Sequence, residues 1–184
     1  MNQIIVPDTP MMRQYRDIKI HNMDSILFFR LGDFYEMFFD DAKLASKELD
    51  ITLTARGKDE NRMPMCGIPH HAADSYIAKL VSRGYKVAIC EQVEDASVSK
   101  GITKRDVVKV ITPGTLLAHG LLDEKENNYL MAINPILKES LFGISYADIT
   151  TGEFRIFIAR NHDELISQID RLGAKEIIIP TDSE

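Results

Sequence analysis

The residues whose types and spacing suggest chemistry lie in one short stretch, RLGDFYEMF at positions 30–38. An apolar run ends there at a turn-forming Gly32, and Phe34 and Glu36 follow the turn two positions apart. An exposed aromatic ring at a rigid turn can wedge between base pairs, where stacking contributes about 1 to 3 kcal/mol per base. Mispaired or unpaired steps stack poorly and kink readily, so such a wedge would prefer them to intact duplex.

Glu36 would add selectivity through its charge. A carboxylate near phosphates is repelled, which weakens binding to ordinary duplex, whereas beside a displaced base it can hydrogen-bond to a ring nitrogen if one of the two groups carries a proton. A purely structural interpretation of the same residues stays open. Asp33 can cap a helix that starts after Gly32, Glu36 then completes a capping box, and Phe34 joins the core. The residue types alone favour this structural interpretation.

A metal site is the second kind of chemistry that the sequence offers. Cys66, His70 and His71 are spaced like zinc ligands, but a structural zinc site commonly has four ligands and the sequence holds no second cluster. Asp148 ends a predicted strand, where a carboxylate can hold Mg²⁺ in a nuclease of ribonuclease H-like architecture. The carboxylates that could complete such a site also suit turns and the first turn of a helix: Glu153, Asp163 and Glu164. We therefore predict no metal and no catalytic residue, with a metal-dependent nuclease using Asp148 as the rival hypothesis.

The helices and strands that must position these residues are predicted from the periodicity of apolar residues and from the Gly, Pro and capping residues between them. Together these signals predict a mixed α/β chain. Helices are expected over 9–21, 33–49, 70–83 and 161–172, and strands over 25–30, 50–55, 86–91, 106–111, 128–133, 141–149, 153–159 and 176–179. The segment 63–69 holds two prolines and a glycine, so we expect a short edge strand or a loop there. Two cysteines in 184 residues do not suggest a disulfide framework, and Cys66 and Cys90 are predicted to be reduced, half-buried thiols.

The charge distribution predicts two domains. The net charge is -6, yet residues 1–115 hold 16 basic and 16 acidic side chains, whereas residues 116–184 hold 6 and 12. We expect a first domain over 1–115, a linker over 116–127 and a second domain over 128–184. The acidic balance argues against a chain held to nucleic acid by bulk electrostatics alone, and the acids of the second part also suit a protein-interaction scaffold.

Several function classes are not expected. No apolar run approaches the about 20 residues of a membrane helix, and the start lacks the segments of a signal peptide, so the cytoplasm is expected and a membrane partner is not. Neither GxGxxG nor GxxxxGK[ST] occurs, so no nucleotide cofactor is expected within these residues.

Ordered blocks along the chain resemble the MutS family of DNA mismatch-repair proteins. The blocks are RLGDFYEMFFDDA, LTARG, MPMCGIPHHAADSYIAKLV, VAICEQ, TPGT and YADITTGEF. The resemblance covers nearly all of the chain and reverses the preference for a structural role of Phe34. It implies a mixed-sheet mismatch-recognition domain with flanking helices over 1–115, and over 128–184 part of a connector domain with a ribonuclease H-like fold.

The same resemblance implies roles for individual residues. Phe34 matches the phenylalanine that enters the base stack from the minor groove, and Glu36 matches the acid that hydrogen-bonds the mispaired base. Further DNA contacts are implied at weaker matches: Arg56, Met65, Lys104 and Arg105.

The resemblance also implies partners and missing parts. It implies mismatched duplex DNA as the ligand, a homodimer in the full-length form, and downstream repair proteins that bind through the connector. The chain would be a DNA-binding module, not an enzyme, located in the cytoplasm at the nucleoid. ATP and Mg²⁺ are expected only in the part of the full-length protein that this sequence lacks.

Overall fold

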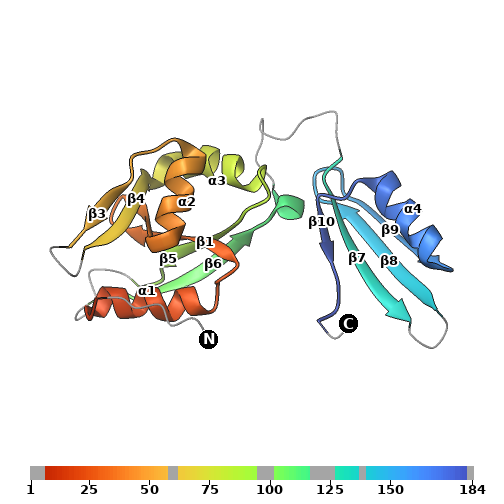
Figure 1. Cartoon of the computed structure of the whole chain (residues 1–184), viewed down its shortest axis with the longest axis horizontal. Helices are drawn as coiled ribbons and strands as arrows, with labels where there is room; N and C mark the ends of the chain where they lie inside the picture. The colour runs from red at the N-terminus through yellow and green to blue at the C-terminus, as the bar shows by residue number, and fades with distance from the viewer. Residues whose placement is uncertain (1–6, 58–61, 95–101, 117–126, 137–139, 182–184) are drawn as a thin grey trace. The chain divides into compact units, whose positions relative to one another are not determined.

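The chain forms two compact units in a computed structural model, which describes residues 7–57, 62–94, 102–116, 127–136 and 140–181. Unit 1 is Met1–Ile111 and unit 2 is Thr112–Glu184, and each has its own sheet (Figure 1). The predicted linker, 116–127, lies almost wholly outside the described residues. The predicted mixed α/β class is confirmed.

Unit 1 is a six-stranded mixed sheet with helices on both faces (Figure 1). The strand order is β3-β4-β2-β1-β5-β6, in which only the β1–β5 pair is parallel. The strands are β1 Ser25–Leu31, β2 Phe34–Phe38, β3 Thr54–Arg56, β4 Met63–Pro69, β5 Lys86–Gln92 and β6 Arg105–Ile111. Helix α1 (Pro10–Ile20) lies on one face, and α2 (Phe39–Leu49) and α3 (Ala73–Val81) lie on the other.

Helix α1 begins where the sequence predicts. The Thr9 hydroxyl accepts from the Met12 amide at 3.3 Å, and Pro10 occupies the first turn, where its missing N–H costs nothing. Tyr15 then packs edge-on against Phe29 and Phe38, with ring centres 5.6 and 5.2 Å away. Such aromatic pairs contribute about 0.5 to 1.5 kcal/mol each beyond their buried area, so they anchor α1 to β1 and β2.

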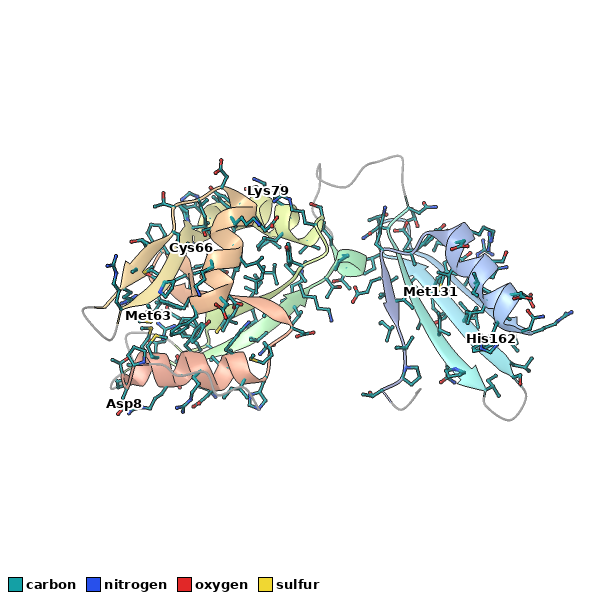
Figure 2. The ribbon with its side chains drawn as sticks, in the orientation of Figure 1. Asp8, Met63, Cys66, Lys79, Met131 and His162 are labelled. Carbon is teal, nitrogen blue, oxygen red and sulfur yellow. The ribbon has the colours of Figure 1, made fainter. Side chains whose placement is uncertain are left out.

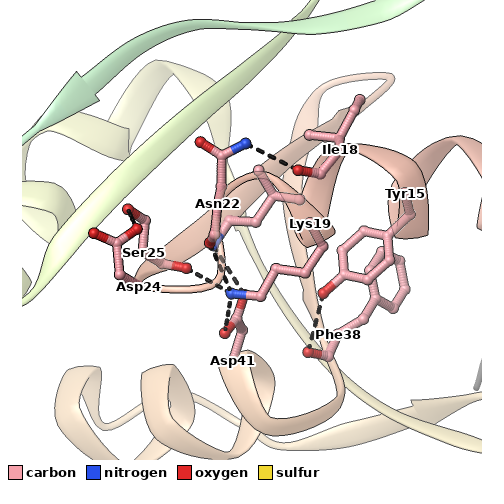
Figure 3. A network of polar contacts seen from close by, with 9 residues as sticks. Tyr15, Ile18, Lys19, Asn22, Asp24, Ser25, Phe38 and Asp41 are labelled. Atoms are coloured by element: carbon pink, nitrogen blue, oxygen red, sulfur yellow. Dashed lines mark hydrogen bonds and ion pairs between the residues drawn. The ribbon is translucent and has the colours of Figure 1, made fainter. Parts of the chain in front are cut away.

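A buried ion pair joins α1 to the other face of the sheet (Figure 3). Lys19 Nζ lies 2.8 Å from Asp41 Oδ2 and donates to the Ser25 carbonyl at 2.6 Å. Lys19 is in the last turn of α1 and Asp41 is in the first turn of α2. The second donor to Asp41 is the Leu27 amide of β1, at 2.9 Å. Because the two side chains are only 9% and 13% exposed, the pair fixes the start of β1 between the two helices.

The predicted helix over 33–49 is wrong in its first part. Phe34–Phe38 is strand β2, which pairs with β1 on one side and β4 on the other, and α2 begins only at Phe39. Gly32, with φ +57°, closes a tight hairpin between β1 and β2. Asp33 and Glu36 form no capping box, since α2 has no side-chain cap. Strands on both sides satisfy the backbone groups of β2, which outweighs one local cap.

The segment Met63–Pro69 is a central strand, β4, and not the predicted edge strand or loop. It lies between β3 and β2, and its prolines stand near its two ends, opposite Ala55 and Phe34. Prolines at these positions remove the fewest ladder hydrogen bonds. Strand β3 covers only Thr54–Arg56 of the predicted 50–55, and the predicted helix over 70–83 divides into the 3₁₀ turn η2 (His70–Ala72) and α3.

Both cysteines are completely buried, and neither forms a disulfide. Cys66 lies on β4 facing α2, where its Sγ donates to the Ala42 carbonyl at 3.4 Å (Figure 2). Burial raises the pKa of each thiol to about 12, so both stay protonated and unreactive at neutral pH.

Unit 2 is a four-stranded sheet with one helix, and its predicted elements are confirmed. The order is β10-β7-β8-β9, in which only β10–β7 is parallel. The elements are β7 Tyr129–Ile136, β8 Leu141–Asp148, β9 Glu153–Ala159, α4 His162–Leu172 and β10 Glu176–Ile178. Met131 and Ile144 lie at the centre of a core that α4 covers (Figure 2). The 3₁₀ turn η3 (Pro113–Thr115) precedes β7 and reaches β10, because the Gly114 amide donates to Glu176 Oε2 at 3.2 Å.

Among the described residues, no helix is long and apolar enough to cross a membrane.

Candidate nucleic-acid interface

Phe34 and Glu36 project from the same face of β2. Successive side chains of a strand point to opposite faces, so Tyr35 and Met37 turn inward on the other face, where both are buried. The Phe34 ring is 47% exposed. A helix would separate residues two positions apart by about 200°, so the strand conformation is what brings the aromatic ring and the carboxylate together.

The tip of the β1–β2 hairpin is tied to the end of β4. The His70 amide donates to the Asp33 carbonyl at 2.9 Å, and His70 Nδ1–H donates to the same oxygen at 3.1 Å. Phe34 itself lies opposite Pro69, the last residue of β4. These bonds restrict the hairpin on the side next to the exposed ring, as a wedge requires.

A polar cluster on the opposite face holds the hairpin to β5. The Tyr35 hydroxyl donates to Glu91 Oε1, and Arg30 Nη1 lies 3.7 Å from the same oxygen. Arg30 also donates through Nε to the Gly32 carbonyl at 2.6 Å and stacks on the Tyr35 ring, with its guanidinium carbon 5.6 Å from the ring centre. Burial and then the Glu91 carboxylate raise the pKa of Tyr35 to about 12, so its hydroxyl remains a donor.

Sequence reasoning missed Arg30, Tyr35 and Glu91 as supporting residues. Alternation along β2 would have placed Tyr35 on the inner face, but only if the segment had been interpreted as a strand. No spacing rule relates Tyr35 to Glu91, 56 positions later, because the contact depends on the order β2-β1-β5.

Arg56 on β3 and Met65 on β4 lie on the two strands to one side of β2, which carries Phe34 and Glu36. Arg56 Nη1 lies 2.7 Å from Glu36 Oε2, with the side chains 44% and 17% exposed. Gly67 stands opposite Glu36 on β4, and a Cβ there would lie 3.6 Å from Glu36 Cγ. Met65 is half-buried at the margin of the unit 1 core. Strands β2, β4 and β3 therefore present an aromatic ring, a thioether and a charged pair.

The two remaining predicted contacts lie elsewhere. Arg105 is buried: it donates to the Arg30 carbonyl at 2.6 Å and to Gln14 Oε1 at 3.2 Å, and its guanidinium carbon lies 5.2 Å from the centre of the Phe29 ring. Burial lowers the pKa of Arg105. This geometry favours a structural role for Arg105, because its Nε and Nη1 groups already donate to acceptors within unit 1. Lys104 is exposed just before β6, at the end of the sheet order opposite β3.

Comparison with known proteins shows which family has this arrangement of domains. Residues 9–120 match the family model described as MutS domain I, and residues 128–184 match the one described as MutS domain II. The chain belongs to the MutS family. The region that matches MutS domain I thus contains the exposed Phe34 and the Glu36–Arg56 pair, and the region that matches MutS domain II contains the sheet of unit 2.

Several bacterial MutS proteins are similar over nearly the whole chain. The DNA mismatch repair protein MutS of Ruminiclostridium cellulolyticum is 58% identical over 175 residues, that of Desulforamulus reducens 56% over 178, and that of Halalkalibacterium halodurans 53% over 171. These alignments cover 93%, 95% and 93% of the chain but 20% of each relative. The chain therefore spans about one fifth of the length of these curated MutS proteins.

Within the MutS domain II region, Asp148 does not form the centre that the nuclease hypothesis needs. Its Oδ1 accepts from the Thr150 amide and hydroxyl at 2.8 and 2.6 Å, and its Oδ2 accepts from the Asn128 amide at 3.1 Å. Burial acts to raise the pKa of Asp148, but these hydrogen bonds hold it below the ordinary value. Across the described ranges, no group of three or more His, Cys, Asp or Glu side chains could hold a metal ion. The geometry thus assigns Asp148 to the turn after β8.

Proposed function

We propose that unit 1 recognises mispaired or unpaired bases in duplex DNA for mismatch repair. Phe34 wedges into the base stack from the minor groove, and Glu36 hydrogen-bonds the mispaired base. The observation that carries this proposal is the exposed Phe34 ring at a braced hairpin, on the same face as Glu36. Membership in the MutS family supports the substrate class.

The selectivity of such a wedge follows from the cost of opening the base stack. Stacking on an aromatic ring contributes about 1 to 3 kcal/mol, which is similar for every base, whereas unstacking a paired step costs a few kcal/mol and less at a mispair. A rigid hairpin matters because a mobile ring would lose part of that gain as conformational entropy on binding. The contacts from His70 and Glu91 supply that rigidity.

We propose that Arg56 and Met65 contact the groove or the backbone beside the wedge. The ion pair of Arg56 with Glu36 supports this assignment, as does the place of Met65 on β4, the strand beside β2. Lys104, which is exposed, stays a proposed backbone contact on a separate part of unit 1.

For unit 2 we propose a connecting role within a longer protein. The chain spans one fifth of its relatives, which leaves room for an ATPase part that would bind ATP and Mg²⁺ and for the contacts of a homodimer. Unit 2 would couple mismatch binding to that part and to downstream repair proteins, in the cytoplasm at the nucleoid. The match of residues 128–184 to MutS domain II supports this assignment.

The decisive experiment compares Phe34→Ala with the unchanged full-length protein in competition binding to a heteroduplex with one G·T mispair and to the matched duplex. Loss of one stacked ring should reduce the ratio of the two affinities about 5-fold to 150-fold, since stacking contributes about 1 to 3 kcal/mol. Thermal unfolding should change little, because the ring is already 47% exposed.

Met23→Ala is the matched control. Met23 is 51% exposed, but it lies before the start of β1, at the far end of that strand from the hairpin. It should leave the affinity ratio unchanged. If Phe34→Ala unfolds unit 1, or keeps the full preference for the mispair, the proposed role of Phe34 is wrong.

A further inference from the structure

The ion pair between Glu36 and Arg56 crosses an intervening strand. Glu36 is on β2 and Arg56 is on β3, with β4 between them. Neighbouring strands lie about 4.8 Å apart, so β2 and β3 are separated by about 10 Å across β4. Glu36 lies opposite Gly67 of β4, whereas Arg56 lies opposite Met63, four positions away on the same strand. The two side chains therefore extend both across and along β4, and Gly67 places no side chain beside Glu36.

The exposure of this pair suits an interaction that forms and breaks. Glu36 is mostly covered, at 17% exposed, while Arg56 is 44% exposed and in contact with solvent. Pairs of this kind gain little net free energy because water and salt screen them, whereas a fully buried pair resists opening. Arg56 can therefore leave Glu36 when a better anionic partner approaches.

DNA offers that partner to Arg56 and a different one to Glu36. A guanidinium binds phosphate oxygens through two parallel hydrogen bonds. A carboxylate beside a displaced base can accept a hydrogen bond from it, but a carboxylate that stays paired with arginine has fewer free lone pairs and a neutralised charge. Glu36 and Arg56 therefore cannot remain paired with each other while Glu36 binds a base and Arg56 binds a phosphate.

We propose that Glu36 and Arg56 form an exchangeable ion pair that controls specificity. On matched duplex the pair stays closed, and Glu36 is held away from the bases. At a mispair the pair opens: Glu36 turns to the displaced base, and Arg56 turns to a backbone phosphate. This inference rests on the proposed function and adds to it a competitor that Glu36 must give up before it can bind a base.

A double-mutant cycle tests whether the pair opens. Glu36→Gln, Arg56→Gln and the double variant of the full-length protein are measured by competition binding to a G·T heteroduplex and to matched duplex at low salt. If the pair is broken only on the mispair, the effects should be non-additive on the heteroduplex by about twofold to fivefold, the strength of an exposed pair, and additive on matched duplex. The non-additivity should decline as salt increases.

Two further variants separate charge from structure. Arg56→Lys keeps the charge and should preserve most of the non-additivity with Glu36→Gln, which a purely packing role would not do. The pair Arg83 and Glu48 is the matched control, because its side chains are 45% and 19% exposed, nearly as in the Arg56–Glu36 pair. Arg83 Nη1 lies 2.5 Å from Glu48 Oε2. The corresponding cycle of Arg83→Gln and Glu48→Gln should be additive on both duplexes.

Additive effects on the heteroduplex, or equal non-additivity on both duplexes, would overturn the exchange. Phe34→Ala, measured in the same assay, keeps the two hypotheses apart. If Phe34→Ala abolishes mispair preference while the cycle is additive, the exchange is wrong and the proposed function stands. If Phe34→Ala leaves the preference intact, the proposed function fails, and the exchange fails with it.

Discussion

Replacing Lys19 with methionine should destabilise unit 1 by about 3 to 5 kcal/mol at pH 7, because it leaves a buried carboxylate without its counter-ion. Lys19 Nζ lies 2.8 Å from Asp41 Oδ2 and donates to the Ser25 carbonyl at 2.6 Å (Figure 3). Methionine has a similar length but donates nothing. Asp41 would keep the Leu27 amide, at 2.9 Å, as its remaining donor in this network.

The loss should depend on pH in a defined direction. Burial raises the pKa of Asp41, while Lys19 and the Leu27 amide act to lower it. Without Lys19 the pKa rises further, and a raised pKa in the folded state makes stability fall as pH rises through it. The deficit of Lys19→Met relative to the unchanged protein should therefore be greatest near neutral pH and shrink toward pH 4, about the ordinary pKa of aspartate.

Urea unfolding followed by circular dichroism measures the deficit, and hydrogen exchange of the Leu27 amide reports on the site itself. Adding Asp41→Asn should recover part of the loss, because the uncompensated charge is removed. Lys43→Met is the control: its ammonium lies 2.9 Å from Asp40 Oδ1, but the pair is exposed, so the loss should stay below about 0.5 kcal/mol. A deficit of Lys19→Met below about 1 kcal/mol, or one that does not shrink in acid, would refute the reasoning.

Other perturbations test the remaining contacts. Tyr35→Phe removes the donor to Glu91 and should lower mispair preference about twofold to tenfold in competition binding, with at most about 1.5 kcal/mol lost in urea unfolding; unchanged preference would mean that the hairpin needs no such brace. Gly114→Ala places a Cβ 3.0 Å from Leu130 Cδ1 and Glu176 Cβ, so thermal unfolding of unit 2 should show a loss of about 1 to 3 kcal/mol; an unaltered melting temperature would contradict this packing. Asp148→Asn should destabilise unit 2 in urea at neutral pH by about 2 kcal/mol. Because the pKa of Asp148 is lowered in the fold, that difference should disappear as pH falls through the lowered value, and a constant difference would contradict the hydrogen-bond assignment.

Elements decided by local signals were predictable from the sequence. Thr9 and Pro10 begin α1, and Asn161 caps α4, because a cap involves only residues within one turn of the helix. Gly173, with φ +54°, ends α4 for the same local reason. The uninterrupted apolar run of β1 also predicted a strand, since a strand covered on both faces needs no alternation.

Local signals were insufficient where distant strands compete with them. Asp33 and Glu36 have the spacing of a capping box, yet neighbours on both sides of β2 satisfy its backbone and make it a strand. The prolines of Met63–Pro69 argued for an edge, but the sequence does not reveal which strands will flank that segment. The sequence also did not reveal the burial of Arg105, because its acceptor, the Arg30 carbonyl, is 75 positions away.

The sequence by itself determined which residues could read a base: an aromatic ring and an acid, Phe34 and Glu36, within blocks that identify the family. Only the tertiary structure decided that these side chains lie on the same face of β2, that Phe34 is exposed there, and that Glu36 is paired with Arg56. Both outcomes depend on the order β3-β4-β2, which joins segments 20 positions apart through backbone hydrogen bonds. Strand order is set by the packing of the whole unit, so the spacing of residues along the chain does not encode it locally.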